Sequence, residues 1–151
     1  MESYKNPISL FKQTNFSKTI WWKLKVNISG YQNETEDKLV TEIFKNRIFR
    51  LIYPNIYQNN HKFSRILVQL YEDGYVCWIN LDGLIIEKYE FKKNNSLENE
   101  QFFIKDKVNS ILKWIKDQAE LTNEYLWGGT LGPNFDCSGL IQTAFLKHRI
   151  H

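Results

Sequence analysis

The chain has 151 residues, of which 42% are hydrophobic and 15% are aromatic. This composition is sufficient for a packed core and argues against an intrinsically disordered chain. No apolar run approaches the roughly 18 residues of a membrane helix, and residues 1–16 lack the apolar core of a secretory signal. We therefore expect a cytoplasmic protein with no membrane partner.

The formal net charge of +3 comes from the N-terminal end, where residues 1–31 contain five lysines against Glu2 alone. A basic segment of this kind can attract nucleic acid. Lys23 and Lys25, however, alternate with apolar residues, as on the solvated face of a strand. We therefore interpret the lysines as surface residues and expect no nucleic-acid partner.

The first elements after residue 20 follow the period of a strand. Alternating apolar residues predict a strand over 22–28, closed by a turn at Ser29-Gly30. Between residues 35 and 45 the apolar residues change to helical spacing, which predicts a short helix there.

The strand pattern then continues to residue 89. Asp73-Gly74 is a strong signal for a β-hairpin, and Pro54 is expected to end the strand before it. The predicted strands cover 47–53, 63–70, 75–81 and 83–89. Several short strands of this kind predict a small antiparallel β-barrel within an α+β fold.

The polar segment 89–101 reads as a linker, after which the period becomes helical. An amphipathic helix is expected to end near Leu121, and the glycine-rich segment 128–133 is expected to form a loop. A second helix is predicted from Cys137 to Lys147.

The two cysteines, Cys77 and Cys137, form no disulfide framework. Cys77 lies in a β-type run, where a buried thiol acts as a small hydrophobic side chain. Cys137 follows Asp136, a good N-cap residue, and a helix N-terminus favours the thiolate. Spacing alone leaves two interpretations open, a nucleophile or a cysteine that only packs. For a nucleophile, the N–H groups of Ser138 and Gly139 would be open to an oxyanion, and the Tyr125 phenol could reach the same pocket.

Two segments resemble a known family. Tyr125-Leu126-Trp127-Gly128-Gly129, followed by Asp136-Cys137-Ser138-Gly139-Leu140-Ile141, resembles the nucleophile segment of the NlpC-type cell-wall cysteine peptidases. Residues 70–75, with Trp78 and Ile79, resemble the bacterial SH3-like domain of the two-domain members, which are D-γ-glutamyl-L-diamino acid endopeptidases. The resemblance implies an SH3-like barrel at 1–88, ordered from about residue 20, and a linker at 89–101. Residues 102–151 would then be an incomplete papain-like catalytic domain whose sheet is missing.

The resemblance also implies a role for each matching residue. Cys137 would attack the amide carbonyl, and Tyr125 would hold the oxyanion or the substrate. Asp136 and Ser138 would bind the free amino end of a murein peptide. The reaction would hydrolyse the bond between D-γ-Glu and a diamino acid in peptides with a free N-terminal L-Ala. It would call for no metal and no organic cofactor.

The catalytic base is where the chain departs from the family pattern, because relatives carry it on strands well downstream of the cysteine. His148 lies eleven residues beyond Cys137, about 16 Å along a helix, whereas an imidazole base must approach to about 3 Å. His151 is farther still, and His61 is interpreted as a solvated loop residue. We therefore expect this C-terminally truncated chain to have little or no activity alone.

Three further interpretations remain open beside an inactive peptidase. The chain could be a non-catalytic module that binds wall peptides or a protein. It could be half of a split enzyme whose partner polypeptide supplies the base. It could also belong to a related cysteine fold that performs acyl transfer.

Overall fold

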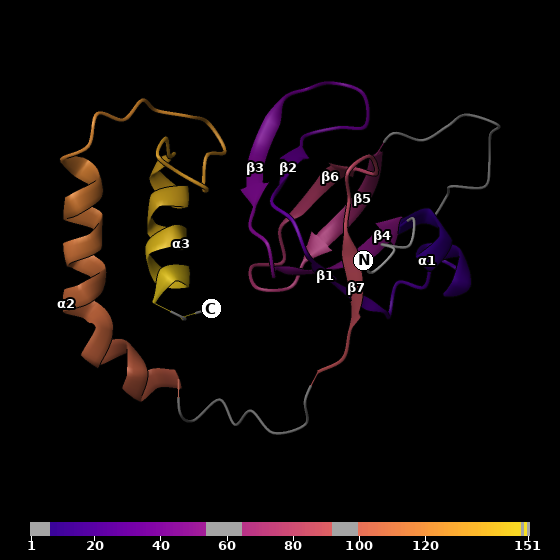
Figure 1. Cartoon of the computed structure of the whole chain (residues 1–151), viewed down its shortest axis with the longest axis horizontal. Helices are drawn as coiled ribbons and strands as arrows, with labels where there is room; N and C mark the ends of the chain where they lie inside the picture. Colours follow the sequence, from indigo (N-terminus) through magenta and orange to yellow (C-terminus); the bar gives the residue numbers. More distant parts are fainter. Residues whose placement is uncertain (1–6, 54–64, 92–99, 149, 151) are drawn as a thin grey trace, which may run out of the picture. The chain divides into compact units, whose positions relative to one another are not determined.

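A computed structural model describes residues 7–53, 65–91, 100–148 and 150. The chain divides into two compact units, Met1–Glu90 and Phe91–His151 (Figure 1). Within the described residues, the first unit contains a short helix and a β-sheet, and the second contains two longer helices. The α+β class expected from the sequence is therefore confirmed. None of the helices in the described ranges is long and apolar enough to cross a membrane.

The sheet of the first unit has seven strands, and every neighbouring pair is antiparallel. The spatial order of the strands is β3-β2-β6-β5-β4-β1-β7. The strands are β1 (Trp21–Leu24), β2 (Ile28–Tyr31), β3 (Leu39–Ile43), β4 (Ile48–Tyr53), β5 (Arg65–Leu70), β6 (Val76–Asn80) and β7 (Ile86–Tyr89).

The hairpin prediction at Asp73-Gly74 is confirmed, because β5 and β6 pair directly across this turn. Gly74 adopts a φ of 69°, which glycine tolerates without a steric cost. The turn is also held by the buried Arg47, whose Nε lies 3.2 Å from Glu72 Oε2 and whose Nη2 lies 2.8 Å from Asp73 Oδ2. The guanidinium thus ties the start of β4 to the turn between β5 and β6.

Three local predictions in the first unit are wrong. The strand expected over 22–28 is interrupted, because β1 ends at Leu24 and β2 begins at Ile28. Residues 35–45 do not form a helix, because Leu39–Ile43 pairs with β2 as β3 and buries Thr41 and Ile43 at a period of two. Ser29-Gly30 is not a turn but part of β2. A Cβ atom on Gly30 would lie only 2.8 Å from the Sγ of Cys77, so the glycine permits close packing between strands.

The hydrophobic core of the first unit includes residues that precede the expected start at about residue 20. Helix α1 (Pro7–Gln13) buries Phe11 completely, and the Phe11 ring packs edge-on against Trp22, with centroids 5.1 Å apart. Phe16, just after the helix, is also buried. Sequence periodicity did not reveal α1, because a seven-residue helix with one fully buried residue has almost no period.

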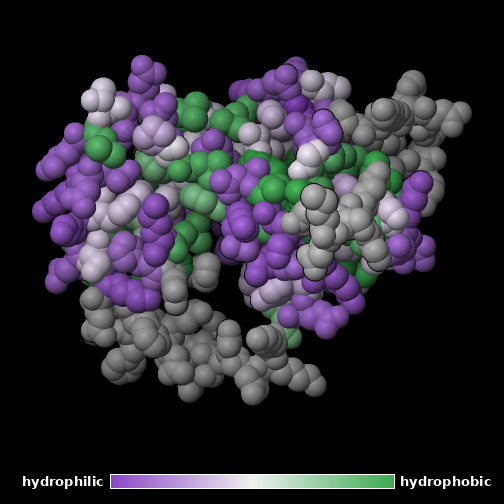
Figure 2. Space-filling view, viewed as in Figure 1, coloured by the Kyte–Doolittle hydropathy of each residue, from purple (hydrophilic) through white to green (hydrophobic). Residues whose placement is uncertain are grey.

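The second unit consists of α2 (Glu100–Ala119) and α3 (Cys137–Lys147), which pack against each other. Helix α2 begins inside the segment expected to be a linker at 89–101, whereas α3 has the bounds that the sequence predicts. The Nζ of Lys107 on α2 donates to the carbonyl oxygen of His148 at 2.6 Å. The outward face of α2 is hydrophilic (Figure 2), as expected for an amphipathic helix.

Replacement of Phe11 tests whether α1 belongs to the folding core. Phe11→Ala should lower the free energy of unfolding by about 3–5 kcal/mol, because a large buried side chain is lost and a cavity remains. Urea denaturation followed by tryptophan fluorescence measures the loss. Lys12→Ala, an exposed neighbour on the same helix, is the control and should change stability by less than about 0.5 kcal/mol.

Candidate active site

The start of helix α3 is capped by Asp136, as the sequence predicts. Asp136 has extended backbone angles, φ −88° and ψ 175°, and its Oδ1 accepts the Gly139 N–H at 2.6 Å and the Ser138 hydroxyl at 2.8 Å. Its other oxygen, Oδ2, accepts the N–H of Gly128 at 2.9 Å. One carboxylate therefore binds both the helix start and the preceding loop.

These hydrogen bonds determine the ionisation of Asp136. Partial burial by itself would raise the pKa of this carboxyl group. The bonds from Gly139, Ser138 and Gly128 favour the charged form, and together they lower the pKa below its ordinary value of 3.8. Asp136 is thus a carboxylate at neutral pH.

The loop that precedes α3 packs closely against the first turn of this helix. Tyr125 and Phe135 form an isolated parallel bridge, and the N–H of Asp136 donates to the Gly129 carbonyl at 3.2 Å. A Cβ atom on Gly139 would lie only 2.0 Å from that same carbonyl oxygen. Only glycine at position 139 lets the helix and loop backbones approach this closely.

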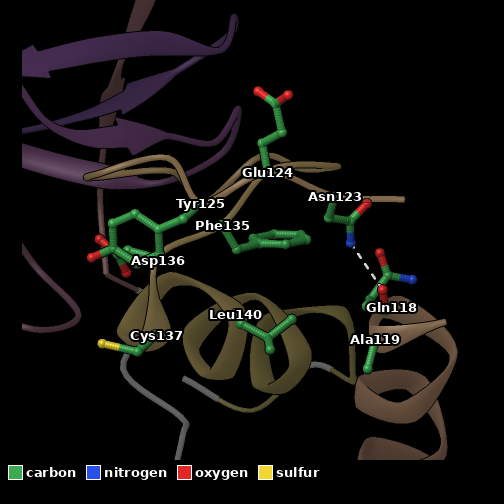
Figure 3. A pocket seen from close by; sticks show the side chains of 9 residues that line it. All are labelled: Gln118, Ala119, Asn123, Glu124, Tyr125, Phe135, Asp136, Cys137 and Leu140. Carbon is green, nitrogen blue, oxygen red and sulfur yellow. Dashed lines mark hydrogen bonds between the residues drawn. The ribbon is translucent and has the colours of Figure 1, made fainter. Parts of the chain in front are cut away.

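Cys137 is the first residue of α3 and is exposed. Figure 3 shows its side chain pointing away from Leu140, with Tyr125 and Asp136 beside the start of the helix. An open pocket of about 280 Å³ lies next to these residues. It is lined by Gln118, Ala119, Asn123, Glu124, Tyr125, Phe135, Asp136, Cys137 and Leu140.

The structure brings together the four residues that the sequence selects. Tyr125, Asp136 and Cys137 line one pocket, and Ser138 is hydrogen bonded to Asp136. One expectation is corrected: the N–H of Gly139 is not open to an oxyanion, because Asp136 already accepts it.

The histidine nearest in sequence does not reach Cys137. Helix α3 continues unbroken to Lys147, so His148 lies at its far end, about 16 Å from the cysteine at about 1.5 Å per residue. Its Nδ1 lies 2.7 Å from the Ala144 carbonyl oxygen. His61 and His151 lie outside the described residues. In the parts of the chain that the structure describes, no three His, Cys, Asp or Glu side chains cluster as a metal site would require.

The sequence analysis missed Thr143 and, for Gly139, missed its role in packing. Thr143 is fully buried, and its hydroxyl donates to the Thr130 carbonyl at 2.5 Å. Gly139 provides the close approach to the loop. A signal for Thr143 was present, because it is a polar residue beside the apolar stripe of α3, six positions after Cys137.

Cys137 thus lies exposed at the start of a capped helix, beside Tyr125 and a pocket. Residues 122–151 match the model of the NlpC/P60 family. The match covers the loop, Cys137 and α3, but not the sheet. Comparison with curated proteins gives no match.

The two thiols should differ sharply in reactivity. Burial raises the pKa of Cys77 to about 12, despite the opposing effect of nearby Arg47, whereas Cys137 is exposed. Iodoacetamide should therefore label one thiol in the native protein and two in denaturant, as counted by mass spectrometry. Cys137→Ser should leave no reactive thiol in the native protein. Equal native labelling of both thiols would contradict the assignment.

The cap at Asp136 should make stability depend on acid. Asp136→Ala should cost about 0.5–2 kcal/mol at neutral pH, the usual cost of losing an N-cap. Because folding lowers the pKa of Asp136, its ionic contribution is present above about pH 3.8 and is lost as the pH falls through the lower folded value. The difference between wild type and variant should therefore shrink in acid, as measured by urea denaturation at several pH values. A difference that grows in acid would have the wrong sign.

Proposed function

We propose that this chain carries the nucleophile of a cysteine peptidase that hydrolyses the bond between D-γ-Glu and a diamino acid in murein peptides with a free N-terminal L-Ala. The observation that carries the proposal is the position of Cys137. It is exposed at the capped N-terminus of α3, it lines a pocket with Tyr125, and it lies within the segment that matches the NlpC/P60 family.

The chemistry follows from this position. The helix N-terminus stabilises negative charge, so it favours the Cys137 thiolate that attacks the γ-carbonyl of D-Glu. The tetrahedral oxyanion would be held by the Cys137 N–H and the Tyr125 hydroxyl. Expulsion of the diamino acid, with a proton delivered to its amine, leaves a thioester on Cys137. Water then hydrolyses the thioester, which releases L-Ala-D-Glu and restores the thiol.

The base that takes the thiol proton is the remaining requirement. None of the described residues supplies an imidazole near Cys137, because His148 lies at the far end of α3. In this proposal the base comes from a residue outside the described ranges or from a second polypeptide that completes the catalytic domain.

The remaining parts of the proposal concern substrate selection. Ser138 and Asp136 present a hydroxyl and a negative charge beside Cys137, which suits the ammonium group of an N-terminal L-Ala. The first unit would act as an SH3-like domain that restricts the substrate to peptides with a free N-terminal L-Ala.

A second candidate is non-catalytic binding of the same peptides. The observation that favours it is the hydrogen bond between His148 Nδ1 and the Ala144 carbonyl. This bond holds the His148 imidazole at the C-terminal end of α3, away from Cys137. Under this alternative the peptide binds, but no thioester forms on Cys137.

Protection of Cys137 from alkylation tests the proposal. The peptide L-Ala-γ-D-Glu-diaminopimelate should slow the reaction of Cys137 with iodoacetamide, because its γ-carbonyl must lie against Sγ before attack. The matched control is the isomer joined through the α-carboxyl group of Glu, which should protect less. Equal alkylation rates with and without the γ-linked peptide would contradict the proposal.

A second readout separates the two candidates. Calorimetry detects peptide binding wherever on the chain it occurs. Binding without protection of Cys137 would favour the non-catalytic module. Protection, together with a peptide adduct of Cys137 seen by mass spectrometry, would favour the peptidase.

A further inference from the structure

Three consecutive loop residues are each held by α3. The Gly128 N–H donates to Asp136 Oδ2 at 2.9 Å, and the Gly129 carbonyl accepts the Asp136 N–H at 3.2 Å. The Thr130 carbonyl accepts the Thr143 hydroxyl at 2.5 Å. All three loop residues are buried. Residues 128–130 of the loop are therefore bound to α3 and its N-cap, and Asp136 makes two of the three bonds.

We propose that Asp136 is a positioning residue, whose carboxylate ties the loop at Gly128 to the first turn of α3 and thereby holds Cys137 in place without contacting the substrate. This proposal rests on the proposed function only in taking Cys137 as the nucleophile.

The position of Cys137 depends on its neighbours because its own side chain is exposed. Packing around an exposed side chain does little to define where its Sγ lies. The backbone on either side is instead held by Asp136, which binds Gly128 before the cysteine and Gly139 after it. Loss of the carboxylate would free both sides together.

The carboxylate also has little capacity left for a ligand. An ionised carboxylate offers about four acceptor positions, and Asp136 already accepts from Gly128, Ser138 and Gly139. The Ser138 hydroxyl donates its one proton to Asp136 and keeps its lone pairs for an incoming ammonium group. Direct contact with a free amino end therefore falls to Ser138, with the charge of Asp136 behind it.

Asp136→Asn separates the two functions of the side chain. Asparagine is as good an N-cap as aspartate. Gly128 and Gly139 donate to different carboxylate oxygens, and in asparagine one of these positions is a donor nitrogen, so in the observed geometry only one of the two bonds can form. Asp136→Ser has the same property, because it caps well with a single oxygen. Ser138→Ala is the matched control, since it leaves both carboxylate bonds to the backbone intact.

Amide exchange measured by NMR on the whole chain is the first readout. In the wild type both the Gly128 and Gly139 amides should exchange at least about tenfold more slowly than in an unstructured chain. In Asp136→Asn one of the two should lose this protection, while Ser138→Ala should keep both. A Gly128 amide that exchanges at the unstructured rate in the wild type, or that stays protected together with Gly139 in Asp136→Asn, would overturn the proposal. Unfolding of both Asp136 variants but not of Ser138→Ala would support it, because both variants keep a cap.

Peptide selectivity is the second readout. The γ-linked peptide is used with its N-terminus free and with its N-terminus acetylated, and protection of Cys137 is compared. Each peptide is used at a concentration that protects the wild type. Positioning predicts that Asp136→Asn weakens protection by both peptides, whereas Ser138→Ala weakens only the free-amine peptide. Selective loss of the free-amine peptide in Asp136→Asn would identify Asp136 as a substrate ligand and overturn the proposal. If neither peptide protects the wild type, the proposed function fails, and the amide readout still decides the role of Asp136.

Discussion

The candidate site depends on one close approach, between the backbone of the loop at Gly129 and the first turn of α3 at Gly139. A Cβ atom at position 139 would lie 2.0 Å from the Gly129 carbonyl, far inside van der Waals contact. Because the two backbones are this close, one carboxylate can reach donors on both of them. Tyr125, which lies on the same loop, is brought beside Cys137 by the same contact.

The close contact between the loop and α3 also provides hydrogen-bond partners for N–H groups at the start of the helix. A helix leaves its first N–H groups without internal partners. Asp136 satisfies one of them at Gly139 and one loop donor at Gly128. Charge-assisted bonds of this kind are stronger than neutral ones. The cost is that fewer helix N–H groups remain for an oxyanion, so more of that role would fall to the Cys137 N–H and the Tyr125 hydroxyl.

Parts of the structure that depend only on residues adjacent in the sequence could be predicted from the sequence. The Asp73-Gly74 hairpin and the start of α3 at Cys137 both follow from residues adjacent in the sequence, a turn pair and an N-cap. The four candidate site residues lie within fourteen positions, from Tyr125 to Ser138. For the same reason they could be found without knowledge of the fold.

Features that depend on distant residues could not be predicted in this way. The apolar spacing between residues 35 and 45 suits a short helix as well as a strand, and pairing with β2 decides for the strand. Gly30 resembles a turn residue, yet its role is to make room for Cys77, which lies 47 positions later. The bond from Gly128 to Asp136 was equally hidden, because it depends on the path of the intervening loop.

Each unit is stabilised internally by a different kind of interaction. This difference explains why polar contacts dominate at the candidate site. The first unit has a continuous core of buried aromatic and aliphatic side chains. Within residues 107–148 of the second unit, the buried hydrophobic side chains are those of Ile111 and Ala144. With so little apolar burial near Cys137, packing alone cannot define one loop geometry. Directional hydrogen bonds must do so, and the Asp136 carboxylate accepts from Gly128, Ser138 and Gly139 beside the nucleophile.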